Sequence, residues 1–429
     1  MKSNQPHIAF ISEHASPLAT LGGVDTGGQN VYVAQVAKYL ARNGYAVDVF
    51  TRWENAAMPQ VINWVPGVRV IHVKAGSVEV IPKENILEFM PEFTQSMVDF
   101  INAEEINYEL IHAHFFMSGL VAANLKALLH IPFAITFHAL GHVRRIHQGN
   151  SDLFPAERLQ IEEDVVKQAD YIIAECPQDR DDLMNYYQAP SYKIVIVPCG
   201  FSHQEFYPIE KTLARKTLNL DIDKHIILQL GRMVPRKGVD NVIRSLSYLK
   251  SPQAVQLVIV GGESDVPDPA NSLELSRLQK IAAEHGVEAS IKFVGRKSRE
   301  QLKFYYAAAD VFISTPWYEP FGITPLEAMA CGTPVIGSNV GGIKYTVVDG
   351  ETGALVPPED PAALAAKVEE MVGDSERLQE MGNNALKRVN TYFTWKHVAD
   401  KIGKVYSKII ALNHKNLEQQ ALKSKKKAA

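Results

Sequence analysis

Short apolar runs alternate with longer segments of helical periodicity along most of the chain. In the first half these runs cover residues 8–11, 47–51, 68–73, 111–113, 133–137, 171–174 and 194–197. In the second half they cover residues 226–230, 257–260, 291–294, 311–314, 335–337 and 354–356. Runs that are apolar almost throughout are typical of strands covered on both faces, and strands that alternate with helices form parallel sheets from βαβ units. The pattern therefore predicts an α/β protein.

A polar stretch from residue 198 to residue 220 separates the two series of runs. Pro198, Gly200 and Pro208 interrupt the apolar pattern there. We expect two doubly wound, Rossmann-like domains, over residues 1–205 and 206–393. Ligands of such open sheets bind beyond the carboxyl ends of the strands, so two domains that face each other predict one interdomain cleft.

Composition and charge disfavour several kinds of partner and cofactor. The 429 residues include 46% hydrophobic and 21% charged residues, as in an ordinary globular protein. The net charge of −4 provides no general attraction for nucleic acid, and no run approaches the roughly 18 apolar residues of a membrane span. Three widely spaced cysteines predict neither disulfides nor a zinc cage, which favours a reducing cytoplasm. The lysine-rich residues 416–429 are expected to form a solvated, disordered tail.

Two segments carry residues suited to phosphate. The first is a glycine-rich loop over residues 22–30, whose glycines let the backbone approach an anion at the start of a helix. The second follows the strand at 226–230, where Arg232 can hold two phosphate oxygens and Lys237 adds a compact charge. Together these cations suit a diphosphate leaving group without a metal. The alternative to phosphate binding is a flexible turn for the glycine-rich loop and a solvated basic turn for the segment with Arg232 and Lys237. The chain contains no nicotinamide fingerprint and no P-loop motif, which disfavours those cofactors.

Acidic and histidine side chains complete the candidate chemistry. Glu319 lies in the loop after the strand at 311–314, and Glu327 lies early in the following helix, where an acidic residue is also a plain stabiliser. Such a pair suits a glycosidase acid and nucleophile, or the hydroxyls of a ribose and a hexose, and the nearby phosphate segments favour the second use. His138 ends a strand and can donate a hydrogen bond to a substrate hydroxyl. The pair His112 and His114 lacks further ligands at zinc spacing, so we predict no metal site.

The order of these motifs resembles one known family, the retaining glycosyltransferases of family 4. The match comprises the glycine loop, residues 136–138, Arg232 with Lys237, and Glu319 with Glu327 in the spacing E-x7-E. It runs over nearly the whole chain, including residues 394–399, which look like the family's closing helix. The resemblance implies the GT-B fold, with a crossover helix over residues 394–415 that packs on the first domain. It also implies retention of configuration during transfer from an α-linked nucleotide sugar, with no metal and no other cofactor.

The resemblance assigns roles to individual residues. The catalytic set it implies is His138, Arg232, Lys237 and Glu319. His138 would contact the transferred sugar, Glu319 the donor sugar and Glu327 the ribose hydroxyls. The donor phosphates would meet Gly27, Gly28, Arg232 and Lys237, the base would lie beside Gly295 and Arg296, and further donor contacts would come from Phe321, Gly322, Ile323 and Thr324. No enzyme nucleophile is implied, so electrostatic stabilisation of the leaving diphosphate would supply much of the catalysis.

Residues 25–33 resemble the branch that holds sucrose-phosphate synthase, sucrose synthase and the inositol-phosphate N-acetylglucosaminyltransferase of mycothiol synthesis. Asn30, Lys83 and Arg158 match acceptor-binding positions of the last enzyme, and two cations suit a phosphate. Phe115 and Ala139 stand where that enzyme has a tyrosine and a threonine, so two contacts to acceptor hydroxyls are missing. The resemblance implies a UDP-glucose donor and a sugar-phosphate or polyol-phosphate acceptor. A fructose or fructose 6-phosphate acceptor is the alternative.

The sequence leaves two other kinds of function open. A nucleotide-sugar sensor without turnover would keep the same binding residues. A nucleotide-sugar epimerase or dehydrogenase would need a nicotinamide fingerprint and a Tyr-x-x-x-Lys, and the spacing from Tyr392 to Lys396 lies near the wrong end of the chain. We expect no nucleic-acid partner and no integral membrane segment. The oligomeric state, a homodimer included, is left open by the sequence.

Overall fold

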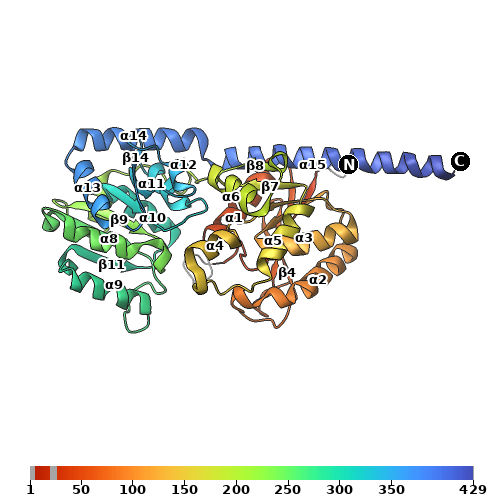
Figure 1. Cartoon of the computed structure of the whole chain (residues 1–429), viewed down its shortest axis with the longest axis horizontal. Helices are drawn as coiled ribbons and strands as arrows, with labels where there is room; N and C mark the ends of the chain where they lie inside the picture. Colours follow the sequence, from red (N-terminus) through yellow and green to blue (C-terminus); the bar gives the residue numbers. More distant parts are fainter. Residues whose placement is uncertain (1–4, 20–26, 429) are drawn as a thin grey trace. The chain divides into compact units, whose positions relative to one another are not determined.

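A computed structural model describes residues 5–19 and 27–428 of the chain (Figure 1). These residues form two compact units. The first combines the chain up to Ala19 with Gln29–Pro198 and the segment from Lys396, and the second combines Gly27 and Gly28 with Cys199–Trp395. The chain thus leaves the first unit after Pro198, a few residues before the predicted boundary at residue 205.

The first unit is built on an eight-stranded sheet in the order β3-β4-β2-β1-β5-β6-β7-β8. Its strands are β1 (His7–Ile11), β2 (Ala46–Arg52), β3 (Val61–Val65), β4 (Val68–Val73), β5 (Leu110–His114), β6 (Phe133–Thr136), β7 (Tyr171–Ala174) and β8 (Ile194–Ile196). Neighbouring strands run parallel, except that β3 pairs with β4 in antiparallel fashion. The central strand β1 is buried from Ile8 to Ile11, which explains its continuous apolar run.

Helices connect the strands of the first unit. They are α1 (Gly28–Arg42), α2 (Met90–Ala103), α3 (Phe116–Leu129), α4 (Gly141–Gln148), α5 (Arg158–Gln168) and α6 (Pro177–Tyr187). A short 3-10 turn, η1 (Lys83–Asn85), precedes α2. The core beneath α2, α3 and α5 is aromatic and aliphatic, with Phe93, Phe116, Phe133 and Val165 almost fully buried.

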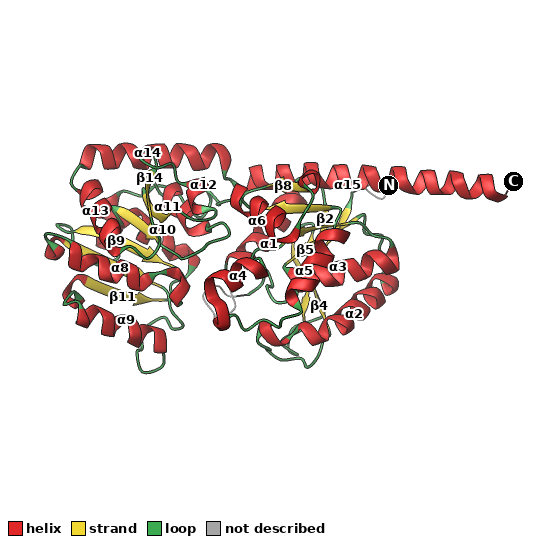
Figure 2. Ribbon diagram, in the orientation of Figure 1, coloured by secondary structure: helices red, strands yellow, loops and turns green. Residues whose placement is uncertain are grey.

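The second unit is built on a six-stranded parallel sheet in the order β11-β10-β9-β12-β13-β14. Its strands are β9 (His225–Leu230), β10 (Val255–Val260), β11 (Ile291–Gly295), β12 (Val311–Ser314), β13 (Val335–Ser338) and β14 (Gly353–Val356). The helices are α7 (Lys211–Thr217), α8 (Val239–Ser245), α9 (Leu273–Glu284), α10 (Arg299–Ala308), α11 (Ile323–Ala330), α12 (Ile343–Thr346), α13 (Pro361–Val372) and α14 (Ser375–Tyr392). Figure 2 shows these strands in yellow with helices over them.

The last helix, α15 (Trp395–Ala428), packs on the first unit. Tyr406 reaches Nδ1 of His112 with its hydroxyl at 2.6 Å, and Asn43 donates to Asp400 at 2.9 Å. The residues of α15 that are buried along this helix include Val398, Ala399, Ile402, Val405, Tyr406 and Ile409. The prediction of a disordered tail is wrong, because α15 continues helically through residues 416–428. That stretch is rich in Leu, Gln and Lys and lacks Gly and Pro, so its helix propensity is high.

The structure confirms the predicted α/β class and the predicted strands to within two residues at each end. One strand, β3, was not predicted. Its residues are mostly half-buried, with Asn63 exposed, as befits an edge strand that shows only weak apolar patterning. A turn at Pro66 and Gly67 pairs it with β4. Within the described residues, no helix has the length and apolar character needed to cross a bilayer.

Candidate functional site

Two loops of the second unit bring the predicted cations and Glu319 together. One follows β9 and carries Arg232 and Lys237, and the other follows β12 and carries Glu319. Since β9 and β12 are neighbours in a parallel sheet, their carboxyl ends lie side by side. The backbone N–H of Trp317 donates to the carbonyl of Arg236 at 3.0 Å. Gly238 has a φ of +66°, and a Cβ there would overlap the carbonyl oxygen of Thr315.

Lys237 and Glu319 form the centre of this cluster. The Lys237 Nζ contacts Oε2 of Glu319, and Nη1 of Arg236 lies 3.8 Å from the same oxygen. Burial lowers the pKa of Lys237 to about 8, against the opposing attraction of Glu319. Burial alone would raise the pKa of Glu319, but Lys237 and the neighbouring arginines outweigh it and lower that pKa. Three cations around one carboxylate leave net positive charge, which suits an anionic ligand.

Two glycines contact the backbone of the loop that carries Glu319. Neither was predicted from the sequence to belong to the site. Gly342 donates its N–H to the carbonyl of Glu319 at 3.2 Å. Gly341 has a φ of +45°, and a Cβ there would overlap that same carbonyl. Phe321 is buried, Gly322 precedes α11 with a φ of +90°, and Ile323 and Thr324 open the helix, so their amides belong to its N-terminal turn.

Glu327 lies on α11 and is buried, with a side chain only 3% exposed. Its Oε1 lies 2.9 Å from Nη2 of Arg299, and its Oε2 accepts a hydrogen bond from the Tyr306 hydroxyl at 3.0 Å. Burial raises the pKa of Glu327, and the charge of Arg299 opposes that rise. The carboxylate predicted to meet ribose is therefore already held at both oxygens.

Of the remaining donor residues, Gly27 lies beside Arg232 and Gly28 lies beside Ile323. A Cβ on Gly27 would lie 3.8 Å from Nε of Arg232, and one on Gly28 would lie 3.7 Å from Ile323. Gly295 ends β11 with a φ of +81°. Arg296 directs its Nε at Asp265, 3.0 Å away. Residues 22–26 of the glycine loop lie outside the described residues.

His138 belongs to the first unit and follows β6 with a φ of +59°. Its Nδ1 lies 3.2 Å from Oε1 of Glu175, and its Nε2 lies 3.1 Å from Nδ1 of His114. Both ring nitrogens are thus engaged by the protein, and the side chain is 9% exposed. Burial lowers the pKa of His112 to about 3 and that of His114 well below its usual range, so both are neutral. Contact of His138 with a transferred sugar stays a prediction.

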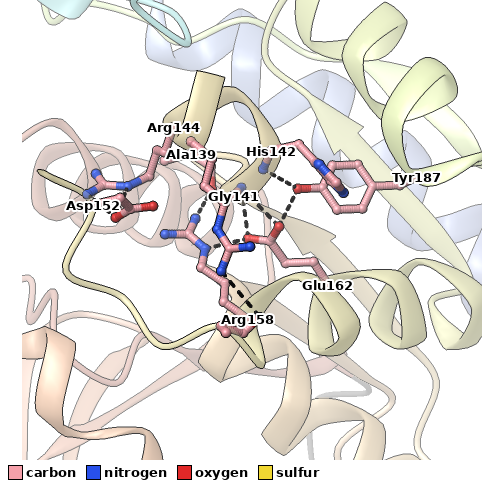
Figure 3. A network of polar contacts seen from close by, with 10 residues as sticks. Ala139, Gly141, His142, Arg144, Asp152, Arg158, Glu162 and Tyr187 are labelled. Atoms are coloured by element: carbon pink, nitrogen blue, oxygen red, sulfur yellow. Dashed lines mark hydrogen bonds and ion pairs between the residues drawn. The ribbon is translucent and has the colours of Figure 1, made fainter. Parts of the chain in front are cut away.

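Arg158, predicted to bind an acceptor phosphate, is almost fully buried. Figure 3 shows its guanidinium within a polar network around Glu162. Arg158 donates from Nε to Glu162 at 2.8 Å and from Nη2 to the carbonyl of Ala139 at 2.6 Å. Glu162 also accepts from the N–H of Gly141 at 2.9 Å and from the hydroxyl of Tyr187. The Nη1 of Arg158 is buried and has no hydrogen-bond partner among the described residues.

The other two predicted acceptor residues also lie in the first unit. Asn30 is buried in the first turn of α1 and donates to the carbonyl of Ser16 at 3.0 Å. Lys83 lies in η1 with its Nζ 3.5 Å from Glu84, and its side chain is partly exposed. The described contacts do not join Asn30, Lys83 and Arg158 to one another directly.

The residues that hold the predicted side chains in place were not predicted from the sequence. Glu175 follows β7, so its place at a strand end could have identified it. Arg299 and Tyr306 lie on α10, where an arginine at a helix start and a tyrosine among apolar residues carry no signal of their own. Their partner Glu327 lies on a different helix, and only the packing of α10 beside α11 joins them.

Comparisons with known proteins place the chain in a family. A family model described as Glycosyltransferase Family 4 matches residues 26–205, and one described as Glycosyl transferases group 1 matches residues 210–388. The D-inositol 3-phosphate glycosyltransferase of Corynebacterium jeikeium is 34% identical over 421 residues, which cover 96% of this chain and 99% of that protein. The D-inositol 3-phosphate glycosyltransferase 2 of Catenulispora acidiphila is 33% identical over 417 residues, which cover 96% of this chain and 96% of that protein.

Solved structures agree with this placement. Sucrose-phosphate synthase from Thermosynechococcus elongatus matches with a TM-score of 0.87 at 35% identity, covering 95% of this chain and 100% of that one. The Anabaena protein HepE, solved with UDP and glucose, matches with a TM-score of 0.73 at 19% identity over 94% of this chain and 100% of its own, and shares the fold. Since both halves match family models and relatives align over almost their whole length, this chain belongs to the glycosyltransferases, with a family 4 domain and a group 1 domain on the GT-B fold.

Proposed function

We propose that this chain is a cytoplasmic, retaining hexosyltransferase that moves glucose from UDP-glucose to a sugar-phosphate or polyol-phosphate acceptor. The product would be an α-glycoside, and neither a metal nor another cofactor would be required. The observation that carries the proposal is the partly buried contact of Lys237 with Glu319 beside Arg236 and Arg232. A cationic site of this kind, with one carboxylate inside it, suits a ligand that presents phosphates and sugar hydroxyls together.

The proposed transfer step uses the positive charges of Arg232 and Lys237. The bond between the anomeric carbon and the diphosphate oxygen breaks, and the acceptor oxygen bonds to that carbon on the same face. The acceptor proton passes to the leaving diphosphate. Arg232 and Lys237 stabilise the charge that develops on that group, while Glu319 accepts hydrogen bonds from the donor sugar. Lys237 and Glu319 pair with each other, which holds both side chains at this site.

The proposed binding of a phosphorylated acceptor depends mainly on Arg158. Its buried Nη1, to which no described residue hydrogen-bonds, offers a donor to a phosphate oxygen, and Lys83 adds a second, more exposed cation. Fructose 6-phosphate is the second candidate acceptor beside an inositol phosphate. The high similarity to a sucrose-phosphate synthase supports it, as do Phe115 and Ala139, which lack the hydroxyls found in the inositol-phosphate enzyme.

An array of donors and acceptors tests the proposal. UDP-glucose, ADP-glucose, GDP-glucose and UDP-N-acetylglucosamine are each mixed with fructose, fructose 6-phosphate or inositol phosphates, and products are read by mass spectrometry. We expect one phosphorylated acceptor to be glycosylated, with activity retained in EDTA and abolished by Lys237→Met. Arg277→Gln removes an arginine of α9 that is paired with Glu274, and serves as the matched control. Binding of a donor without turnover would favour a sensor, and strict dependence on a divalent metal would contradict the proposed mechanism.

A further inference from the structure

The carboxylate of Glu327 is clamped by two side chains from the neighbouring helix α10. Arg299, the first residue of α10, approaches Oε1 at 2.9 Å, and Tyr306, two turns later, donates to Oε2 at 3.0 Å. Because one partner acts on each oxygen, the carboxylate group cannot rotate about its last bond without losing a contact. Its plane is thereby set by α10.

Arg299 is itself held by a second layer of contacts. Its Nε contacts Oε2 of Glu205, and its guanidinium lies 4.8 Å from the ring centre of Phe206. Tyr306 is fully buried, and its backbone carbonyl accepts a hydrogen bond from Thr333 at 2.7 Å. The clamp therefore consists of Arg299 and Tyr306, each fixed independently of Glu327.

A carboxylate oxygen carries two lone pairs, so each oxygen of Glu327 retains one after its protein contact. Two remaining lone pairs in a fixed plane suit two adjacent hydroxyl groups. The charge of Arg299 also opposes the burial that raises the pKa of Glu327, which favours the ionised form that only accepts hydrogen bonds.

We propose that Arg299 and Tyr306 are positioning residues that orient Glu327 to accept hydrogen bonds from both hydroxyls of the donor ribose, and that this clamp sets the preference for ribonucleotide over 2′-deoxyribonucleotide donors. The inference rests on the proposed function, since it takes Glu327 to face the ribose. Neither residue touches the donor, so the clamp acts through the orientation of one carboxylate.

Calorimetric titration of the full chain with UDP, ADP and GDP and their 2′-deoxy counterparts tests the clamp. For the base that binds best, we expect the wild-type chain to bind the ribonucleotide about tenfold or more tightly than the deoxy form, since a hydrogen bond to an ionised group is worth at least that much. In Arg299→Gln and in Tyr306→Phe this preference should fall to about threefold or less, because the ribonucleotide loses contacts from two hydroxyls and the deoxy form loses only that of its 3′-hydroxyl. Arg299→Lys keeps a positive charge near Glu327 and should retain part of the preference.

Each outcome separates the two proposals. If no nucleoside diphosphate binds the wild-type chain, the proposed function fails. If the wild type shows the preference and both variants keep it, or lose affinity equally for both forms, the clamp is overturned and the residues are merely structural. Tyr306→Phe removes one hydroxyl and nothing else, so it keeps the test decisive should Arg299→Gln fold poorly. Arg277→Gln should leave the preference intact.

Discussion

Glu175 lies 3.2 Å from Nδ1 of His138, at the end of the strand next to the one that His138 follows. A carboxylate can only accept, so Nδ1 of His138 carries a hydrogen and the ring is held in one orientation. The other nitrogen faces His114 at 3.1 Å. His138 also has a left-handed backbone, which a non-glycine residue adopts at a cost. The fold thus fixes both the backbone and the ring of this residue.

Glu175→Ala should lower kcat by about tenfold or more while the KM for the donor stays close to the wild-type value, because the ring of His138 loses its orientation. Glu175→Gln still offers an oxygen to Nδ1 of His138, so its kcat should lie between those of Glu175→Ala and the wild type. Steady-state kinetics with the best donor and acceptor measures both constants. Glu380→Gln, on an exposed position of α14, is the control. An unchanged kcat in Glu175→Ala would show that the orientation of His138 does not matter to the reaction.

Affinity for a nucleoside diphosphate should fall as the pH rises through about 8. Burial lowers the pKa of Lys237 to about 8, so the ammonium group that attracts the diphosphate is present below that pH and lost above it. Titration with the best-binding nucleotide between pH 6.5 and about 9.5 measures the effect, which we expect to approach tenfold. Lys237→Met should bind weakly at every pH and show no such fall. A wild-type affinity that stays level across this range would contradict the assignment.

Gly341→Ala should abolish donor binding, because a Cβ there would overlap the carbonyl oxygen of Glu319 and displace the loop that carries it. Gly350→Ala is the matched control: its φ is also positive, at +77°, but an added Cβ there would meet no atom of the described chain within 4 Å. The control should cost only the backbone strain, about 1–2 kcal/mol, and keep its affinity for nucleotide. Titration calorimetry and thermal unfolding distinguish the two variants. Equal affinities would mean that the loop does not depend on this close approach.

Glu162→Ala should lower the free energy of unfolding by about 3 kcal/mol or more, since it leaves the charge of Arg158 buried without its partner. Gly141 and Tyr187 lose hydrogen bonds to the same carboxylate. Glu163→Ala changes the next residue of α5, which is only half-buried, and should have little effect. Urea denaturation followed by circular dichroism measures both. Similar midpoints for the two variants would show that the buried network contributes little to stability.

The residues that touch substrate in the proposal were visible in the sequence, whereas the residues that hold them were not. Arg232, Lys237, Glu319 and Glu327 stand at characteristic distances from predicted strands and helices, at the sheet ends where ligands of open α/β sheets bind. Glu175, Arg299, Tyr306 and Gly341 act across gaps of tens of residues. No local pattern records such a contact, because it depends on which helices and strands pack side by side.

The α/β class, the strands other than β3 and the two series of βαβ units were determined by the sequence alone, because apolar periodicity and turn chemistry act over a few residues at a time. Tertiary structure decided that Lys237 meets Glu319, that Glu327 is clamped at both oxygens and that both nitrogens of His138 are engaged. It also decided that Arg158 is buried and that the basic end continues a helix. These outcomes depend on burial and on distances between remote residues, which set the charge, orientation and accessibility of each side chain.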